Sequence, residues 1–527
     1  FASKIWRMGR RLAAVILSVL LLSGGWLGLS GFPLLAALVP LLWISRGYDA
    51  SRRAWWGMFG WALLAFALWN AATVWWIWYA TPVGPFAATL ASSTLNMIAF
   101  MLFHTVSKRA PKALAYTVLV SAWIATEYWY TVGEFSWPWL LLGNGFSHEV
   151  WAVQWYEYTG IFGGTLWTLV ANILLFEALV SRRTRRIVAA AAWIALPLFI
   201  SLTIWFTWRT PAAGTVTVTL VQPNVDPYKK FEDGTSSAQM DNLLRLAAEA
   251  PADADYIVMP ETAVPGYYYE TSIRTAPPVQ AFARLLAEKY PSARIIAGFN
   301  TLRIYPEGGQ SSTARHDARG WYDVFNSALE IDSASGVSIH HKGRLVIGAE
   351  KTPLPWLFRA LDFLVIDLGG TLGQIGVGTR GTAFTGPAGS VGPAICYEGM
   401  YGDFFGDFVR RGAQAMLIIS NDGWWGDTPG YKHLFTISRL RAIEHRRAIA
   451  RSANTGISGF ISPRGDIGAT LGWDVRGTLT GEVPLMAEQT FYTRYGDYLG
   501  RISEYVLLLS VLYFMAYRIR RRNHLVP

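Results

Sequence analysis

The sequence has 527 residues, of which 52% are hydrophobic and only 16% are charged, with a formal net charge of +10 at pH 7. Soluble domains carry about 25% charged residues, so this deficit of charged residues disfavours an ordinary soluble protein and predicts one that lies in a membrane. The positive charge does not indicate nucleic-acid binding, because 18 of the 46 Lys and Arg residues flank apolar segments. They form clusters at 4–11, 46–53, 108–112, 182–186 and 518–522.

Eight apolar segments approach or exceed the length of about 20 residues that crosses a bilayer. They are 11–29, 32–46, 54–77, 86–107, 113–131, 160–181, 187–208 and 499–518. An even number of spans places both termini and all five basic clusters on one side. The short loops on the other side, at 24–31, 78–85 and 132–158, contain neither Lys nor Arg. This asymmetry predicts cytoplasmic termini and an external domain at 210–498.

The membrane region contains a carboxylate, Glu127, near the middle of the span at 113–131. Intramembrane carboxylates usually have a functional role or pair helices. The first apolar segment has no A-x-A-like cleavage site, so we expect a retained helix and not a signal peptide.

The region 210–498 alternates short apolar runs with helical patterns, which is typical of a layered α/β domain with its site at the strand ends. The predicted strands are 215–222, 256–259, 294–299, 327–331, 391–396 and 415–420, and the predicted helices are 236–250, 278–290, 402–412 and 432–448. The segment 305–321 is rich in Gly, Ser and charge, which predicts an exposed loop.

Three chemically reactive residues follow predicted strands. They are Glu261 in VMPET, Lys342 in HKGRLV, and Cys396 in AICYE, the only cysteine of the chain. Each is unremarkable alone, since a lone cysteine is more often a buried apolar residue than a nucleophile. Together they predict a nucleophilic thiol with a carboxylate base and an ammonium that stabilises negative charge.

The chemistry of acyl transfer also needs a donor to the oxyanion, and the backbone N–H of Tyr397, directly after the thiol, is the natural one. His340 and His341 beside Lys342 offer a less favoured Cys-His alternative. No Cys/His cluster has metal-ligand spacing, and no glycine-rich loop cradles a phosphate, so we expect no metal and no cofactor.

The motifs VMPET, HKGRLV, AICYEG, SNDGWWGDTPG and RSANTGISG resemble the nitrilase superfamily. Together with the apolar segments and SWPWLLLGN, they resemble its membrane-bound branch, the apolipoprotein N-acyltransferases. The resemblance implies Glu261 as general base, Lys342 as transition-state stabiliser and Cys396 as acylated nucleophile. It implies four supporting residues, Glu350, Glu398, Tyr397 and Asn326.

One departure is visible after Lys342, where Ile347 stands in place of the family's usual proline. It leaves the shape of that loop open. Trp424 and Trp425 have two interpretations, either packing beneath the site or contact with a lipid substrate. Gly423, Gly426, Gly456 and Gly459 are expected to serve tight turns.

The expected architecture is an α-helical transmembrane bundle of eight helices plus an α/β nitrilase-type α-β-β-α sandwich domain. Its expected parts are a membrane domain at 1–209, a periplasmic catalytic domain at 210–498, and an eighth helix with a basic tail at 499–527. The protein is expected to be a monomer, and the resemblance implies that it lies in the bacterial inner membrane. It would move an acyl chain from a phospholipid, such as phosphatidylethanolamine, through a Cys396 thioester to the α-amino group of a diacylglyceryl-cysteine lipoprotein.

Two alternatives remain open from the sequence. A membrane-tethered amidase or nitrilase that hydrolyses a soluble C–N substrate would use the same three residues, because water or an amine accepts the same acyl group. A transporter or receptor with an external binding domain is the other. It is disfavoured because the apolar segments offer few charged residues for a translocation path.

Overall fold

The computed structural model describes residues 2–209, 212–230, 234–351 and 374–523, and the chain forms two compact units. One unit takes in the chain up to Thr207 and again from Asp497 onward, and the other spans Trp208–Gly496. We call them the helical unit and the catalytic unit, the second because it contains Glu261, Lys342 and Cys396, which the sequence predicts to be catalytic. The catalytic unit is therefore inserted into the sequence of the helical unit, just before its last helix.

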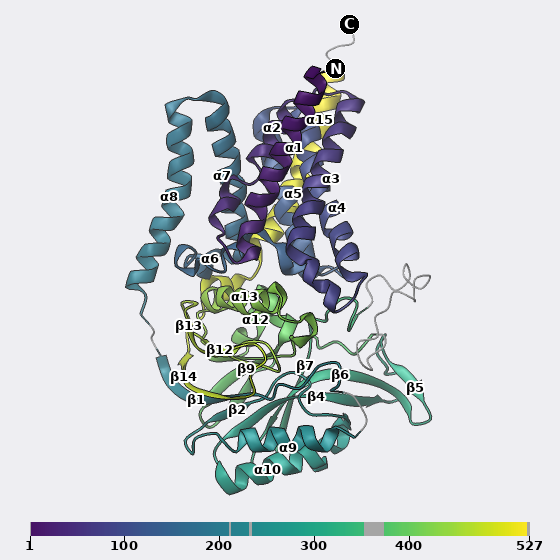
Figure 1. The fold of residues 1–527 in the computed structure, drawn as a ribbon, viewed down its shortest axis with the longest axis vertical. Helices are drawn as coiled ribbons and strands as arrows, with labels where there is room; N and C mark the ends of the chain where they lie inside the picture. The colour runs from purple at the N-terminus through teal and green to yellow at the C-terminus, as the bar shows by residue number, and fades with distance from the viewer. Residues whose placement is uncertain (1, 210–211, 231–233, 352–373, 524–527) are drawn as a thin grey trace. The chain divides into compact units, whose positions relative to one another are not determined.

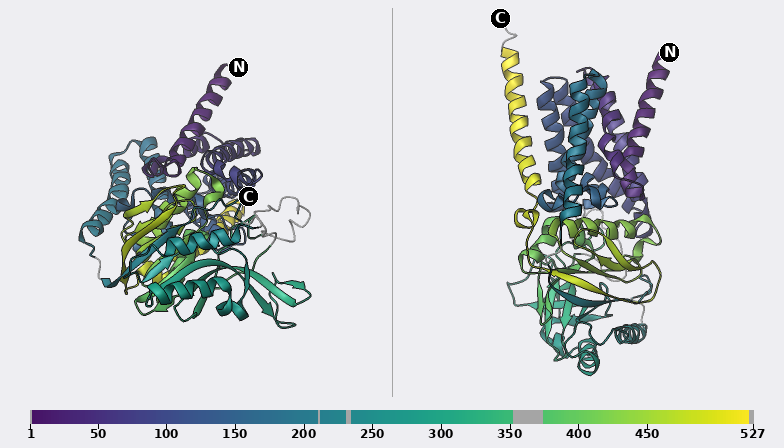
Figure 2. Two further views of the ribbon diagram at one scale, coloured as in Figure 1. Left: turned by 60° about the horizontal axis from the view of Figure 1, so that its bottom comes forward. Right: turned by 90° about the vertical axis from the view of Figure 1, so that its left-hand side faces the viewer.

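The helical unit consists of α-helices and short 3₁₀ helices. Its elements are α1 (Ala2–Ser23), η1 (Gly24–Leu27), η2 (Phe32–Ala36), α2 (Val39–Arg46), α3 (Arg52–Val74), η3 (Trp75–Tyr79), α4 (Gly84–Ser107), α5 (Lys112–Val132), η4 (Pro138–Leu140), η5 (Leu142–Phe146), η6 (Val150–Ala152), α6 (Tyr156–Thr159), α7 (Ile161–Ser181), α8 (Thr184–Thr207) and α15 (Tyr498–Asn523). Within the helical unit, α1 begins and α15 ends at the same end (Figure 1; Figure 2, right), as an even number of spans requires.

Six helices in the described part of the chain are long and apolar enough to cross a membrane, and the protein is an integral membrane protein on this evidence. They are Trp6–Leu27, Arg52–Tyr79, Gly84–Ser107, Ile161–Ser181, Thr184–Thr207 and Tyr498–Arg521. The predicted span at 32–46 is a shorter helical segment, broken between η2 and α2. The predicted span at 113–131 is helix α5, of full length but with Tyr, Trp and Glu127 among its apolar residues.

Glu127 has a structural role in the helical unit. Its carboxylate accepts hydrogen bonds from Trp123 Nε1 at 3.0 Å, from the backbone N of Leu142 at 2.8 Å and from Thr165 Oγ1 at 2.5 Å. These donors come from α5, η5 and α7, so one side chain joins two helices to the irregular segment between them. The helix-pairing interpretation of this carboxylate therefore accounts for its contacts.

The catalytic unit contains two sheets. The eight-stranded sheet has the order β14-β1-β2-β4-β6-β5, with β3 on β4 and β7 on β6, and the six-stranded sheet has the order β13-β12-β11-β10-β9-β8. The strands of the first are β1 (Ala212–Gln222), β2 (Tyr256–Val258), β3 (Tyr267–Tyr269), β4 (Arg294–Tyr305), β5 (Arg315–Asp317), β6 (Gly320–Ile331), β7 (Val337–His341) and β14 (Gly477–Met486). Those of the second are β8 (Phe384–Gly386), β9 (Gly389–Ile395), β10 (Ala415–Ser420), β11 (Ile449–Ala453), β12 (Ser458–Ile461) and β13 (Ile467–Leu471).

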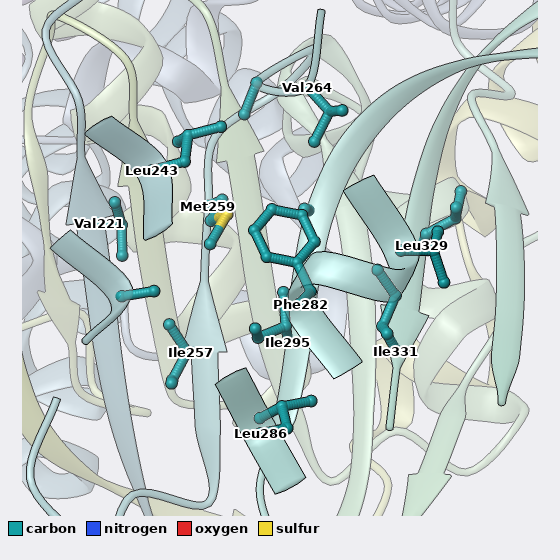
Figure 3. Close-up of a cluster of buried hydrophobic side chains, with 14 of the residues drawn as sticks. Val221, Leu243, Ile257, Met259, Val264, Phe282, Leu286, Ile295, Leu329 and Ile331 are labelled. Atoms are coloured by element: carbon teal, nitrogen blue, oxygen red, sulfur yellow. The ribbon is translucent and has the colours of Figure 1, made fainter. Parts of the chain in front are cut away.

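Helices cover the sheets of the catalytic unit. They are α9 (Ser236–Ala247), α10 (Pro277–Lys289), α12 (Gly402–Arg410), α13 (Pro429–His445) and α14 (Phe491–Tyr495), with 3₁₀ helices η7 (Glu270–Thr275), η9 (Cys396–Met400) and η10 (Gly423–Trp425). Helices α9 and α10 lie on one face of the eight-stranded sheet (Figure 1), where Phe282 and Leu286 of α10 pack on Ile257 and Ile295 (Figure 3). The α/β sandwich with two sheets that the sequence predicts is confirmed.

Two local predictions differ from the structure. The segment 305–321 is not simply an exposed loop, because it contains β5 and the ends of β4 and β6, which pair as an extended antiparallel ladder. Strand β9 ends at Ile395, so Cys396 is not the last strand residue but the first residue of η9. The thiol therefore sits where the chain turns out of the six-stranded sheet.

Candidate active site

The structure brings Glu261, Lys342 and Cys396 together. Glu261 lies three residues after β2, Lys342 directly follows β7, and Cys396 directly follows β9, so the two sheets both contribute. All three side chains are buried, with exposed fractions of 5%, 1% and 7%. The strand-end pattern in the sequence thus corresponds to one enclosed cluster.

Lys342 is held between two carboxylates. Its Nζ donates to Glu261 Oε1 at 2.7 Å and to Glu350 Oε1 at 2.9 Å. Asn326 Nδ2 donates to the same two oxygens, at 2.7 and 2.9 Å. The backbone N of Asn421 donates to the second oxygen of Glu261 at 3.0 Å. This network of hydrogen bonds fixes the side-chain conformations of Lys342 and Glu261.

Two residues of the site have left-handed backbone conformations that side chains rarely adopt. Cys396 has φ = 47°, and Thr262, next to Glu261, also has φ = 47°. Such a conformation costs on the order of 1–3 kcal/mol and persists only where the surrounding structure enforces it. Here it turns the chain sharply after β2 and β9, which aims both reactive side chains at the same point.

The charges of the cluster determine its resting protonation state. Burial by itself would raise the pKa of Glu261, but the Lys342 charge and the hydrogen bonds from Lys342, Asn326 and the Cys396 thiol bring that pKa below its usual value. Burial would lower the pKa of Lys342, but its two carboxylate neighbours raise it. Burial and the Glu261 charge raise the pKa of Cys396. The resting site is therefore a thiol beside a carboxylate, an arrangement in which a carboxylate can take the thiol proton.

Glu398 is fully buried but has partners other than Lys342. Its carboxylate accepts from the backbone N of Gly343 at 2.6 Å and from the backbone N of Ile395 at 2.6 Å, and it lies 3.1 Å from His340 Nε2. The bonded backbone groups belong to the neighbours of Lys342 and Cys396. Glu398 therefore ties the two reactive segments to each other through their main chains.

Replacing Glu398 with Gln is expected to destabilise the protein by about 2–4 kcal/mol, because the amide NH2 group replaces one of the two oxygens and faces a backbone N–H that then has no acceptor in a buried site. The acylation of Cys396 that the family resemblance implies is expected to slow about tenfold to a hundredfold, since the Glu261–Lys342 pair remains. Thermal unfolding and single-turnover acylation measure the two effects. Wild-type unfolding temperature in this variant would contradict the anchoring role.

The other predicted supporting residues lie in the same cluster or beside it. Glu350 also accepts from the backbone N of Val346 at 2.9 Å, and this bond closes the loop that contains Ile347. Tyr397 is buried in η9, with its ring centroid 5.3 Å from that of Tyr401. His340 contacts Glu398 and Thr382, which favours a structural role over the Cys-His alternative.

The glycines that the sequence predicts in tight turns have different roles from one another. Gly426 has φ = 62° and ends η10, so the tight-turn prediction holds there. Gly456 instead allows a close approach, because a Cβ at this position would lie 2.3 Å from Asp422 Oδ2. Trp424, half-buried, packs its ring at 5.3 Å from that of Tyr228.

The sequence reasoning missed two groups of residues. Lys230 is buried, and its Nζ donates to Thr262 Oγ1 at 2.9 Å and to the carbonyl O of Glu261 at 3.3 Å. Burial lowers the pKa of Lys230 to about 7, although the Glu261 charge opposes that shift. The second group is Ser420 with Arg451. Ser420 ends a predicted strand, the same signal that singled out Glu261 and Cys396.

In the described ranges, no group of three or more His, Cys, Asp and Glu side chains is placed to hold a metal ion. The cluster of the site consists instead of one thiol, one ammonium, two carboxylates and an amide. Such a set can take a proton from sulfur and stabilise an anion.

Comparisons with known proteins match both units. The carbon-nitrogen hydrolase family matches residues 217–491, and the apolipoprotein N-acyltransferase N-terminal domain matches 18–174. An apolipoprotein N-acyltransferase of Chlorobaculum tepidum is 29% identical over 506 residues, covering 90% of this chain and 92% of that one. One of Brucella suis is 27% identical, covering 91% and 88%. A solved Saccharomyces cerevisiae protein of the nitrilase superfamily is 18% identical with a TM-score of 0.36, covering 52% and 91%.

Proposed function

The chain belongs to the carbon-nitrogen hydrolase family and is an acyltransferase of its apolipoprotein N-acyltransferase branch, and we propose that it transfers a fatty acyl chain through a thioester on Cys396. The observation that carries this proposal is the buried contact of Lys342 with Glu261, beside the only thiol of the chain. The proposed catalytic residues are Glu261, Lys342 and Cys396.

In the first step, Glu261 takes the thiol proton while Sγ of Cys396 attacks the ester carbonyl carbon of a phospholipid. The carbonyl oxygen becomes an oxyanion, which the Lys342 ammonium and the backbone N–H of Tyr397 stabilise. The carbon–oxygen bond of the ester then breaks. Glu261 returns its proton to the departing oxygen, giving a lysophospholipid and the acylated thiol.

In the second step, a neutral α-amino group attacks the thioester carbonyl. Glu261 takes a proton from the attacking nitrogen, the carbon–sulfur bond breaks, and the amide is released. The proton returns from Glu261 to sulfur, so the resting thiol and carboxylate are restored. The Glu261 carboxylate takes a proton in both half-reactions. Because Lys342 holds the pKa of Glu261 low, this carboxylate accepts a proton only from a donor directly beside it.

The proposed donor is phosphatidylethanolamine, and the proposed acceptor is the N-terminal diacylglyceryl-cysteine of a lipoprotein. The name of the relatives, apolipoprotein N-acyltransferase, supports a lipoprotein acceptor. Both substrates are anchored in a bilayer, which accounts for membrane helices on an enzyme of this family. The proposed location is the bacterial inner membrane. The proposed organisation is a membrane domain at 1–209, a periplasmic catalytic domain at 210–498 and a final helix at 499–527.

The test is intact mass spectrometry of the purified protein after incubation with dioleoyl phosphatidylethanolamine in mixed micelles, without acceptor. One oleoyl group is expected on Cys396, located by peptide mapping and removed by a synthetic diacylglyceryl-cysteine peptide. Cys396→Ser should gain no mass, because a hydroxyl is a far weaker acid than a thiol. A protein that is acylated by soluble amides and never by phospholipid would instead be a membrane-tethered amidase.

A further inference from the structure

A row of buried polar side chains from β10 and β11 ends on the Cys396 sulfur. Ser420, the last residue of β10, places its Oγ 3.3 Å from Sγ of Cys396. Arg451 of β11 donates through Nη2 to Ser420 Oγ at 3.0 Å and to Asp422 Oδ2 at 2.8 Å. Ser420, Asp422 and Arg451 are each fully buried.

The direction of these hydrogen bonds follows from the groups involved. A guanidinium has donors and no acceptor, so the Ser420 oxygen must accept from Arg451. A serine hydroxyl has one hydrogen, and that hydrogen is then left to point at the Cys396 sulfur. Arg451 therefore fixes Ser420 as a donor to Sγ.

Arg451 is itself held in place on other sides. Its Nη1 donates to the carbonyl O of Ile457 at 2.5 Å, and its salt bridge to Asp422 is shielded from water. The Asp422 carboxylate lies against Gly456, where a Cβ would approach to 2.3 Å, so any larger residue would displace it. Gly456 does not have a left-handed backbone conformation, so the close approach of Asp422 is what explains a glycine at this position.

We propose that Ser420 is a further catalytic residue, which stabilises the Cys396 thiolate by donating a hydrogen bond to Sγ, and that Arg451 is the positioning residue that directs this bond. The proposal rests on the proposed function in assigning Cys396 as the nucleophile. No proton leaves Ser420, because the thiol proton passes to Glu261. The bond is strongest whenever sulfur carries negative charge, which is before attack and again when the amine expels the thiolate.

Several charged or titratable groups surround the nucleophile and its turn. The elements that pack around Cys396 contribute the following groups: Glu261, Lys342, Glu350, Glu398, His340, Asp422, Arg451, Arg441 and Glu444. Substituting Ser420 changes none of these charges. A change in the pH dependence of Cys396 in that variant therefore reports the lost hydroxyl.

Because Cys396 is the only cysteine, alkylation by iodoacetamide reports on this sulfur alone. The experiment measures the alkylation rate of the purified full chain against pH for wild type, Ser420→Ala and Ser452→Ala. Ser452 is the matched control, since its buried hydroxyl donates to the carbonyl O of Val221 on another strand. Ser420→Ala should react about tenfold more slowly near neutral pH, with its profile displaced to higher pH. Ser452→Ala should follow wild type.

The role of Arg451 is tested by Arg451→Lys, alone and combined with Ser420→Ala. A lysine keeps the charge beside Asp422 but lacks the planar fork that reaches several acceptors at once. The single variant should displace the profile in the same direction as Ser420→Ala, and the double variant should add nothing further. Additive displacements would show that Arg451 acts independently of Ser420.

Coincident profiles for wild type and Ser420→Ala would overturn the proposal. The pH profile of acyl-enzyme formation provides a second readout, in which Ser420→Ala should show the same displacement. Alkylation requires no lipid, so a displaced alkylation profile in a protein that never accepts phospholipid would support the role of Ser420 while refuting the proposed acyl donor.

Discussion

Glu261→Gln is expected to slow acyl-enzyme formation at least about a thousandfold, because an amide cannot take the thiol proton, and general bases contribute about 10²–10⁴ to a rate. The high pKa of Cys396 makes the effect large. In Glu261→Gln the Glu261 charge no longer raises the pKa of Cys396, but burial, the larger cause of that raised pKa, remains, and the thiol has lost the group that takes its proton. The measurement is single-turnover acylation by phospholipid, quenched and followed by mass spectrometry.

A matched control for this variant is Glu330→Gln. Glu330 is a buried carboxylate of the same unit, on β6, and its loss should leave the acylation rate within about threefold of wild type. If Glu261→Gln formed the thioester at the wild-type rate, Glu261 would not be the base. Glu350, which also contacts Lys342, would then be the next candidate.

Lys342→Arg is expected to slow acylation by at least about a hundredfold, the range seen when an oxyanion donor is removed. A guanidinium keeps the positive charge but spreads it over a wider plane. The space available is set by two carboxylates at 2.7 and 2.9 Å from Nζ, and the side chain is 1% exposed. Overpacking should cost a further 1–3 kcal/mol or so of stability.

The comparison for Lys342→Arg is Lys432→Arg on the exposed surface of α13, where the ammonium pairs with Asp427 at 3.2 Å. That change should alter neither the unfolding temperature nor the acylation rate. Activity of Lys342→Arg within a few-fold of wild type would mean that only the charge at this position matters, and the oxyanion role would fall.

The predicted strands that proved correct share one property: each is a run of residues with at least one apolar face, buried in the structure, that stops at polar residues. The segment 415–420 is β10 residue for residue, and 215–222 lies within β1, because both are apolar on at least one face and stop at polar residues. Strand β11 was missed since its buried centre contains Arg451. A charged residue in a sequence is expected to be exposed, and the burial of Arg451 depends on its ion pair with Asp422 and on its hydrogen bonds to Ser420 and Ile457.

The site was predictable only in part, because some of its residues come together only through the packing of distant segments. Glu261, Lys342 and Cys396 each follow a strand, and this local pattern is visible in one dimension. The contacts of Glu398 with the backbone of Gly343 and Ile395 depend on the packing of the two sheets. Lys230 reaches the site from the segment between β1 and α9, so its burial is a property of the tertiary fold alone.

The insertion of the catalytic unit ahead of α15 has a consequence for biosynthesis. Helix α15 packs on α5, where Trp129 Nε1 donates to Glu504 Oε1 at 2.5 Å, yet the whole of Trp208–Gly496 is translated between the two helices. At about 5–20 residues per second, the ribosome needs roughly 15 s to a minute for that stretch. During this interval α5 lacks the helix that it packs against in the folded protein, and the catalytic unit is complete before the last helix of the chain is made.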